Sequence, residues 1–371
     1  MKSINFILPG SKDCPTGGYK VIYEYANYMV DNGFRVNVIH PVEPMVPNPQ
    51  AIHVKLHVRP RKWFTYYKKL IDKSYHPGWF NLDRRVNVLW TPTLHRRYIP
   101  DADFLVTTGW QTVDSVSKYS ISKGIKFYIV QDFEFYMSGD QGLKENICNG
   151  CRQPLIKIVY SPAGVEMLKM CAVDADFHIP LGVDFKAFRL TTKISDEHRN
   201  MIGFPTRPGE HKGTQDAVLA LALLREKNGD IFDVWSFGGV KPAFIPDWIK
   251  YYENPSDGLL CTLYNSSSIF VTASHYEGWG LPGSEAMSCG AALVSTLHGG
   301  VSAYAEHGKT ALLSPPKNVN ALCENIVKLV NDRDLLLSIA ENGQRSIQNF
   351  TWERSGLSLM SALLESSGRE M

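Results

Sequence analysis

Residues 274–296 read SHYEGWGLPGSEAMSCGAALVST. A short apolar run ends at Ser274, a glycine-rich turn follows, and a helix is expected to begin near Pro282 because proline suits the first turn of a helix. The apolar run that follows predicts the next strand. The stretch therefore predicts a strand–loop–helix–strand unit, with Glu277 on the loop and Glu285 just inside the helix. We expect the two carboxylates to face a common space.

The same alternation of short apolar runs and helix-length amphipathic segments continues along the whole chain. One series runs from the apolar stretch 4–10 to 176–184, and a second starts at 199–205 and includes a single helical stretch over 319–348. Repeated strand–helix alternation is typical of the α/β class with parallel sheets. We predict two Rossmann-like doubly wound domains facing a cleft. Their expected bounds are 1–185 for the N-terminal domain, 186–198 for a linker, 199–350 for the C-terminal domain, and 351–371 for a terminal helix that crosses back to the N-terminal domain.

The composition is that of a soluble globular protein, with 371 residues, 44% hydrophobic and 20% charged. No apolar run is as long as a membrane span, and the first residues lack the pattern of a signal peptide. The seven cysteines are odd in number and scattered, which fits a reducing compartment better than a disulfide framework. These features predict a cytoplasmic protein.

The net charge is only +2, but basic residues are concentrated in 55–97, where eleven Lys and Arg stand against Asp72 and Asp83. Aromatic residues are interleaved with them over 55–85. This mixture is typical of a membrane interface or of a surface that holds a phosphate-bearing acceptor. The alternative is a solvated face over a local aromatic core. Because nothing here resembles a nucleic-acid-binding module, we expect no nucleic-acid partner.

The C-terminal half carries residues suited to a sugar diphosphate. The first N–H groups of a helix favour an anion, and glycines in the loop before the helix allow a ligand close to the backbone. Carboxylates accept hydrogen bonds from sugar hydroxyls. The segment GFPTRPGEHKGTQDA (203–217) supplies cations, since Arg207 can grip two phosphate oxygens and Lys212 adds a point charge. Taken alone, Arg207 and Lys212 would more often be solvated loop charges, and Glu285 a first-turn glutamate that complements the helix dipole. Glu277 alone could simply be a turn residue.

Together these motifs resemble glycosyltransferase family 4, the retaining nucleotide-sugar transferases of GT-B fold. HYEGWGLPGSEAMSCGAALVST resembles the family's E-x7-E signature, and GFPTRPGEHKG its phosphate-binding loop. HIPLGVDFKAF resembles its interdomain segment, and TGGYKVIYEYANYM its N-terminal glycine loop and first helix. The resemblance covers essentially the whole chain and is strongest from 199 to 310.

The resemblance implies a role for each matching residue. Arg207 and Lys212 would hold the diphosphate and stabilise the leaving nucleotide, Glu277 would contact the donor sugar, and Glu285 would hold the ribose hydroxyls. The remaining donor-binding residues would be Gly278, Trp279, Gly280, Leu281 and Pro282 on the C-terminal loop, with Gly17 and Gly18 on the N-terminal one. The nucleotide-diphosphate sugar would be a substrate, and no metal, cofactor or protein nucleophile is expected.

The sequence departs from the family pattern at YIVQDFEFYM (128–137), where many members carry a histidine. Gln131 is our expected donor-binding residue there and Asp132 the expected catalytic one, although Asp132 or Glu134 could be structural. VQDFE and TTGWQT (107–112) look most like bacterial rhamnosyltransferases of the family, which use a deoxythymidine-diphosphate donor.

The resemblance thus implies a retaining glycosyltransferase of the hexosyl type, with rhamnose as the suggested sugar. It would act on a hydroxyl of a glycan or lipid-linked acceptor in bacterial cell-surface polysaccharide synthesis, in the cytoplasm or on the inner face of the membrane. A nucleotide-sugar epimerase on the same scaffold, or a non-catalytic nucleotide-sugar-binding scaffold protein, is the alternative.

Other patterns are weaker. The acidic triplets at 101–103, 174–176 and 332–334 are better explained by capping or solvation than by a metal. Cys148 and Cys151 lack the second pair that a structural zinc site needs. His275, two residues before Glu277, is either a turn histidine or a direct ligand contact.

Overall fold

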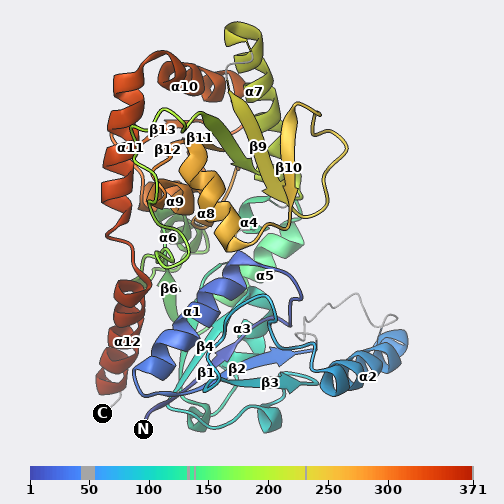
Figure 1. The fold of residues 1–371 in the computed structure, drawn as a ribbon. Helices are drawn as coiled ribbons and strands as arrows, with labels where there is room; N and C mark the ends of the chain where they lie inside the picture. The colour runs from blue at the N-terminus through green and yellow to red at the C-terminus, as the bar shows by residue number, and fades with distance from the viewer. Residues whose placement is uncertain (43–54, 132–133, 138, 230–231, 370–371) are drawn as a thin grey trace. The chain divides into compact units, whose positions relative to one another are not determined.

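The computed structural model describes residues 1–42, 55–131, 134–137, 139–229 and 232–369. The chain divides into two compact units (Figure 1). Unit 1 comprises residues 1–160, 164–179 and 352–371, and unit 2 comprises 161–163 and 180–351. The last helix is therefore part of the same unit as the N-terminus.

Unit 1 is built on a seven-stranded parallel sheet of order β3-β2-β1-β4-β5-β6-β7. Its strands are β1 (Ser3–Ile7), β2 (Arg35–Pro41), β3 (Asn87–Thr91), β4 (Phe104–Thr108), β5 (Ile125–Ile129), β6 (Ile156–Val159) and β7 (Phe177–His178). The central strands are buried along their whole length, as expected for a parallel sheet covered on both faces.

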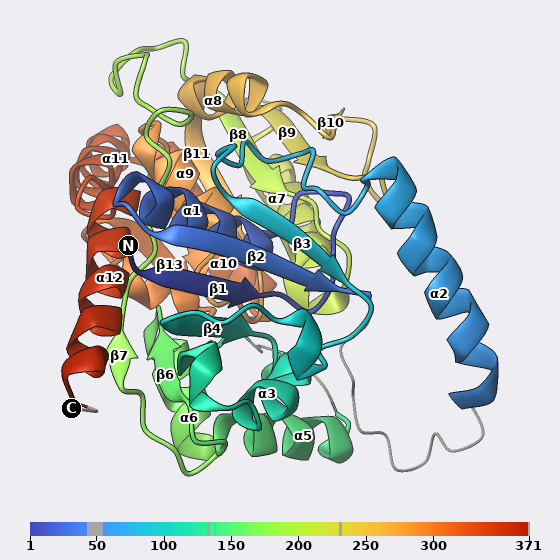
Figure 2. The same ribbon diagram turned by 90° about the horizontal axis from the view of Figure 1, so that it is seen from below.

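Helices cover both faces of this sheet, with α1 and α12 on one side and α3, α5 and α6 on the other (Figure 2). The helices of unit 1 are α1 (Gly17–Asp31), α2 (Lys55–Asp72), α3 (Trp110–Ser117), α4 (Glu134–Met137), α5 (Gln141–Cys151), α6 (Pro162–Met170), α12 (Trp352–Arg369), and the short 3-10 helices η1 (Arg96–Tyr98) and η2 (Ile121–Lys123). The contact between α1 and α12 is close: the Tyr25 and Ser355 hydroxyls are 2.9 Å apart, and a Cβ at Gly356 would stand 2.3 Å from the Tyr28 ring.

Unit 2 is built on a six-stranded parallel sheet of order β10-β9-β8-β11-β12-β13. Its strands are β8 (Met201–Pro205), β9 (Asp233–Gly238), β10 (Ile249–Glu253), β11 (Ser267–Thr272), β12 (Ala292–Thr296) and β13 (Ala311–Ser314). Helices α7 and α10 pack together, and α9 packs against both α8 and α11. The helices are α7 (Thr214–Asn228), α8 (Asp257–Ser266), α9 (Leu281–Ser288), α10 (Val319–Asn331), α11 (Arg333–Ile347), η3 (Glu210–Lys212) and η4 (Gly300–Ala303).

The prediction of one helical stretch over 319–348 was wrong in one respect. The chain forms two helices, α10 and α11, which are separated at Asp332. The Asp332 carboxylate accepts a hydrogen bond from the backbone N–H of Leu335 at 2.9 Å and so caps the N-terminus of α11. This acidic triplet is therefore a capping feature.

A buried arginine joins several parts of unit 2. Arg199 donates one hydrogen bond to the Ser267 carbonyl and one to the Cys289 carbonyl, both at 3.0 Å, and a third to the Thr192 carbonyl at 3.2 Å. Its burial lowers the pKa of the guanidinium to about 10, which still leaves it charged at neutral pH. Arg199 thus fixes the start of β11 and the end of α9, the two segments that flank the E-x7-E loop.

Each sheet has one point at which the strand order reverses. In unit 1 the chain moves from β1 toward β3 and then returns to β4 on the other side of β1, and in unit 2 it does the same at β8 and β11. Open parallel sheets bind ligands at this place, beyond the carboxyl ends of the strands. The predicted pair of Rossmann-like doubly wound domains is confirmed, and the topology indicates where in each unit a ligand belongs.

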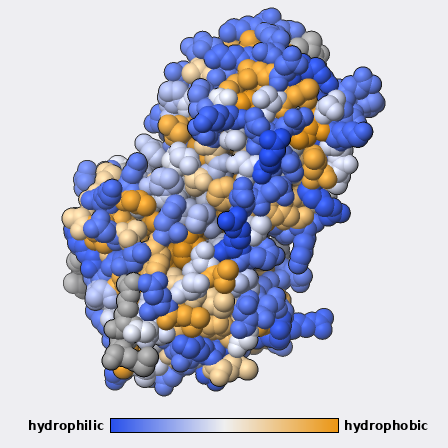
Figure 3. All heavy atoms as spheres, turned by 90° about the vertical axis from the view of Figure 1, so that its left-hand side faces the viewer, coloured by the Kyte–Doolittle hydropathy of each residue, from blue (hydrophilic) through white to orange (hydrophobic). Residues whose placement is uncertain are grey.

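Hydrophilic residues cover most of the face drawn in Figure 3, with hydrophobic residues in several separate groups between them. Within the described ranges, no helix is both long enough and apolar enough to span a membrane.

Candidate functional site

The loops with the predicted cationic and acidic residues follow two neighbouring strands of unit 2. Arg207 and Lys212 follow β8, and Glu277 follows β11, which pairs with β8 in parallel. Both loops therefore leave the carboxyl edge of the sheet at the point where the strand order reverses. This is the position at which a ligand is expected in such a sheet.

The loop after β8 is held by Thr214 at the start of α7. The backbone N–H of Arg207 donates to the Thr214 hydroxyl oxygen at 3.2 Å, and that hydroxyl lies 3.1 Å from the Arg207 carbonyl oxygen. The guanidinium lies 5.0 Å from the centre of the Phe237 ring and is exposed. A cation stacked on an aromatic ring keeps its donors available for an anion.

Glycine is required at position 213, between Lys212 and α7. Gly213 has φ +61°, and a Cβ there would stand 1.8 Å from the carbonyl oxygen of Ala273. The backbone at the start of α7 is thus pressed against the end of β11. This close approach brings the loop after β8 next to the loop after β11.

Lys212 and Glu277 form a direct ion pair between these two loops. The Lys212 Nζ donates to the Glu277 Oε1 at 2.9 Å, and the Ser274 hydroxyl donates to the same oxygen at 3.1 Å. The two side chains are 26% and 24% exposed, so the pair is open to solvent on one side. A phosphate or sugar hydroxyl could reach both groups from that side.

The backbone of Glu277 is hydrogen-bonded to residues 298–300. Its N–H donates to the His298 carbonyl at 3.1 Å, and its carbonyl accepts from the Gly300 N–H at 3.0 Å. A Cβ at Gly300 would stand 2.6 Å from the Gly278 carbonyl, so only glycine allows this approach. The backbone of Glu277 is therefore held by residues 298–300, and its side chain by Lys212 and Ser274.

Burial acts to raise the pKa of the Glu277 carboxyl, but the charge of Lys212 and the hydrogen bonds from Lys212 and Ser274 act against it. The net result is a pKa below the ordinary value. Glu277 is therefore a charged hydrogen-bond acceptor at neutral pH, as a group that binds sugar hydroxyls should be.

Glu285 lies in α9 and is buried, with 8% of its surface exposed. The Tyr264 hydroxyl donates to its Oε2 at 3.5 Å. Burial raises the pKa of Tyr264, the negative charge of Glu285 raises it further, and the charge of Arg207 lowers it. Tyr264 is thus the hydrogen-bond partner that α8 provides for Glu285.

The glycine-rich loop itself is tightly packed. Trp279 is 3% exposed, with its ring 5.1 Å from Tyr304 and 5.6 Å from Phe350, so its side chain belongs to the core. Gly280 has φ +94° and precedes α9, which contains Leu281 and Pro282 in its first turn. The Tyr304 hydroxyl donates to the Gly280 carbonyl at 3.1 Å. The backbone, and not the Trp279 indole, is what this loop can offer a ligand.

Three histidines lie around the ion pair: His275, expected from the sequence to be a turn histidine or a ligand contact, and His211 and His298, to which the sequence assigned no role. His275 bonds through Nε2 to the Asp216 carboxylate at 2.8 Å, and its N–H donates to the His211 carbonyl at 2.7 Å, so it ties α7 to the loop after β11. Burial lowers the pKa of His211, and the charge of Lys212 adds to this effect. Burial lowers the pKa of His298 to about 4, which makes it a neutral ring beside Gly280. His275 is two residues from Glu277 in the sequence, whereas only the fold brings His211 and His298 near it.

The predicted residues of the N-terminal half lie in unit 1. Gly17 and Gly18 begin α1, at the reversal point of this sheet. The Gln131 amide donates to the Thr108 hydroxyl at 2.8 Å and lies 3.5 Å from the Gly18 carbonyl, so it connects the ends of β4 and β5 to the glycine loop. Asp132 lies outside the described residues, and its predicted role is untested.

The weaker sequence patterns have structural explanations. In the first triplet, Asp101 pairs with Lys123 at 2.7 Å and Asp103 accepts from the Ser3 backbone at 2.7 Å. In the second, Asp176 accepts from the Lys157 backbone at 2.7 Å. Cys148 and Cys151 are buried in α5. No group of three or more His, Cys, Asp or Glu in the described part of the chain is arranged to hold a metal ion.

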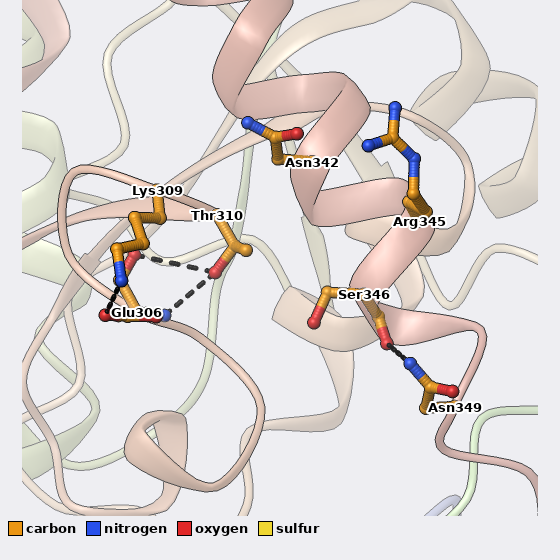
Figure 4. Close-up of a pocket in the computed structure, with 7 residues that line it drawn as sticks. All are labelled: Glu306, Lys309, Thr310, Asn342, Arg345, Ser346 and Asn349. Atoms are coloured by element: carbon orange, nitrogen blue, oxygen red, sulfur yellow. Dashed lines mark hydrogen bonds and ion pairs between the residues drawn. The ribbon is translucent and has the colours of Figure 1, made fainter.

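A recess of about 430 Å³ lies elsewhere in unit 2, between the loop before β13 and α11 (Figure 4). Its lining residues include none of the predicted site residues. Lys309 at its edge is paired with Glu306 at 2.6 Å. The recess is open and polar, and we place the site at the carboxyl edge of the sheet instead, because the predicted charged residues meet there.

Residues 191–346 match the model of the family Glycosyl transferases group 1. The chain is 24% identical over 272 residues to the capsular polysaccharide biosynthesis glycosyltransferase CapM of Staphylococcus aureus, which covers 67% of this chain and 71% of that protein. Matches to three other curated glycosyltransferases span shorter segments, from 25% to 49% of those proteins. The protein is a glycosyltransferase.

Two solved structures show the same fold. The enzyme matches sucrose-phosphate synthase from Thermosynechococcus elongatus with a TM-score of 0.73 and 18% identity over all of both chains. It matches HepE of Anabaena, solved in complex with UDP-glucose, with a TM-score of 0.72 and 16% identity over 98% of this chain and all of the other. The GT-B fold predicted from the sequence is confirmed.

Proposed function

We propose that the enzyme transfers a hexosyl group, with retention of configuration, from a nucleotide-diphosphate donor to a hydroxyl of a glycan or lipid-linked acceptor. The observation that carries the proposal is the Lys212–Glu277 ion pair at the reversal point of the unit 2 sheet. It joins a cation suited to phosphate and an anion suited to sugar hydroxyls at one place. The structural neighbour HepE, whose complex holds UDP-glucose, supports a donor of this class.

In this proposal the diphosphate lies between the loops after β8 and β11. The exposed Arg207 fork binds phosphate oxygens, and Lys212 exchanges part of its contact with Glu277 for a phosphate oxygen. Both cations then stabilise the charge that develops on the leaving nucleotide. The first N–H groups of α9 favour the same anion.

The hydroxyl groups of the donor are held by the two glutamates. Glu277 accepts hydrogen bonds from the sugar, and Glu285 accepts them from the ribose. The acceptor hydroxyl attacks on the face from which the nucleotide departs, and the leaving phosphate takes its proton. In this proposal no protein nucleophile, metal ion or cofactor takes part in the reaction.

The biological setting is proposed from the relatives. CapM is named for capsular polysaccharide biosynthesis, which supports a role in cell-surface polysaccharide synthesis. The predicted cytoplasmic location is kept in this proposal, and the seven free cysteines fit a reducing compartment. Rhamnose as the sugar rests on VQDFE and TTGWQT alone and stays a prediction.

The test is a panel of nucleotide sugars that includes UDP-glucose, GDP-mannose and dTDP-rhamnose. We expect one of them to raise the midpoint of thermal unfolding, since a ligand that binds only the folded state stabilises it. That donor is then followed by NMR with and without a glycan acceptor. Transfer to the acceptor with an unchanged anomeric configuration supports the proposal. Conversion of the donor without an acceptor would show an epimerase, and inversion would contradict the retaining mechanism.

A further inference from the structure

Helix α2 is attached to unit 1 by one of its faces. Beside it, the edge strand β3 carries Trp90, whose indole N–H donates to the Tyr66 carbonyl at 3.0 Å and whose ring stacks on Tyr66. Lys69 donates to the Ser11 hydroxyl at 2.9 Å and to the Asp13 carboxylate at 3.1 Å. Figure 2 shows α2 at the edge of the sheet, next to β3. Positions 66 and 69 therefore face the body of unit 1.

The opposite face of α2 carries an exposed apolar stripe. Its five members and their exposed fractions are Trp63 (44%), Phe64 (70%), Tyr67 (54%), Leu70 (42%) and Ile71 (82%). Their spacing of i, i+1, i+4, i+7 and i+8 places them on one side of a helix. A helix that faces only water on that side would carry polar residues there.

The stripe is unusual for this protein. Of the 17 large hydrophobic side chains that are exposed among the described residues, five fall within these nine positions, and the other twelve are spread over both units. Single exposed hydrophobic residues are normal, but a contiguous group marks an interaction site.

The charges around the stripe indicate the kind of surface that it meets. Lys68 and Lys73 are exposed next to it, and Asp72 is the only acidic residue in the whole of α2. The first half of the helix adds Arg59, Arg61 and Lys62 in sequence. A helix with Trp, Phe and Leu on one side and Lys and Arg on the other lies flat in the interface of a bilayer with anionic headgroups.

We propose that α2 docks the enzyme on an anionic phospholipid surface, with the stripe 63–71 in the headgroup region and the lysines against lipid phosphates. The docking is peripheral and parallel to the membrane plane. The inference rests on α2 alone and stands whether or not the donor chemistry proposed above is right. If both hold, the enzyme is placed at the surface where a lipid-linked acceptor is found.

The experiment uses the full-length protein and sedimentation with sucrose-loaded vesicles. One set of vesicles is phosphatidylcholine alone, and the other is an equal mixture of phosphatidylcholine and phosphatidylglycerol. We expect strong binding to the mixed vesicles, weak binding to the neutral ones, and loss of binding as salt is raised. The double variant Phe64→Ser/Ile71→Ser should bind the mixed vesicles on the order of tenfold more weakly or worse.

The matched control is Ile121→Ser/Met170→Ser, which removes two other well-exposed hydrophobic residues of unit 1, at 70% and 62%. It should bind like the parent protein. Lys68→Gln/Lys73→Gln should lose the preference for phosphatidylglycerol. Circular dichroism confirms that each variant folds. Equal vesicle binding by the parent and the stripe variant, or no binding by the parent, would overturn the proposal. So would a parent dimer that the stripe variant dissociates while vesicles stay unbound, because the stripe would then be an interface between two copies.

Discussion

Replacing Lys212 by methionine tests the site while it keeps most of the side-chain volume. The change removes a charged hydrogen bond to the donor phosphate, a loss of about 1.5–3 kcal/mol, or about 10- to 150-fold in affinity. It also removes charge stabilisation at the leaving group, for which single donors typically contribute about 10²–10³ in turnover. We therefore expect kcat/KM to fall by at least about a hundredfold.

The same substitution should cost little stability, because the Lys212–Glu277 pair is about a quarter exposed and is screened by solvent. Such pairs contribute about 0.2–1 kcal/mol, which corresponds to a Tm change of at most about 4 °C. The matched control is Lys309→Met, which breaks the Lys309–Glu306 pair of the same unit outside the site. Steady-state kinetics and thermal unfolding measure both effects. A loss in kcat/KM below about tenfold in Lys212→Met, or an equal loss in the control, would refute the role of Lys212.

Three further predictions concern the frame around the site. Gly213→Ala should lower the free energy of unfolding by about 1–3 kcal/mol or more, because the new Cβ clashes with the carbonyl oxygen of Ala273. Gly229→Ala is the control: Gly229 also has a positive φ, +76°, but open space around it, so the loss should be only about 1 kcal/mol. Thermal unfolding of the two variants measures the difference. Arg199→Met leaves two buried carbonyl oxygens and one partly buried one without their arginine donor, and should lower the free energy of unfolding in urea by about 3 kcal/mol or more. A loss below about 1 kcal/mol would contradict the structural role of Arg199. Burial lowers the pKa of His298, and of His40 in β2, to about 4. Because the unfolded state binds more protons as the pH falls from about 6.5 toward 4, each histidine should lower the free energy of unfolding by about 2 kcal/mol at pH 5 relative to pH 7. His40→Gln should reduce this pH dependence in urea unfolding followed by a probe in unit 1, and an unchanged slope would contradict the assignment.

The sequence predicted the interior of the fold better than its edges. The buried strands β1, β8 and β11 were all expected, because long parallel strands are continuous apolar runs. The edge strands β3 and β10 were not, since strands with one open side carry a mixed pattern, as in IKYYE. The break at Asp332 was placed inside one helix, because the apolar spacing continues through it and only the cap marks the boundary.

The charged residues of the site could be predicted because their loops follow strands whose order is set by the fold class. The contact between Lys212 and Glu277 follows from the pairing of β8 with β11, which no local pattern in the sequence encodes. Tyr264 could not be found, because at its place in α8 it is indistinguishable from a core residue. The burial of Trp279 was missed for a related reason, because the sequence pattern of a glycine-rich loop does not distinguish a buried tryptophan from one that contacts a ligand.

The central claim is that the loops after β8 and β11 form one nucleotide-binding site. Calorimetric titration of the nucleoside diphosphate of the identified donor tests it most directly, with Arg207→Met, Glu285→Gln and the control Lys309→Met. We expect binding on the order of tenfold weaker or worse in the first two variants and parent-like binding in the third. Equal affinity in all three variants and the parent would contradict it.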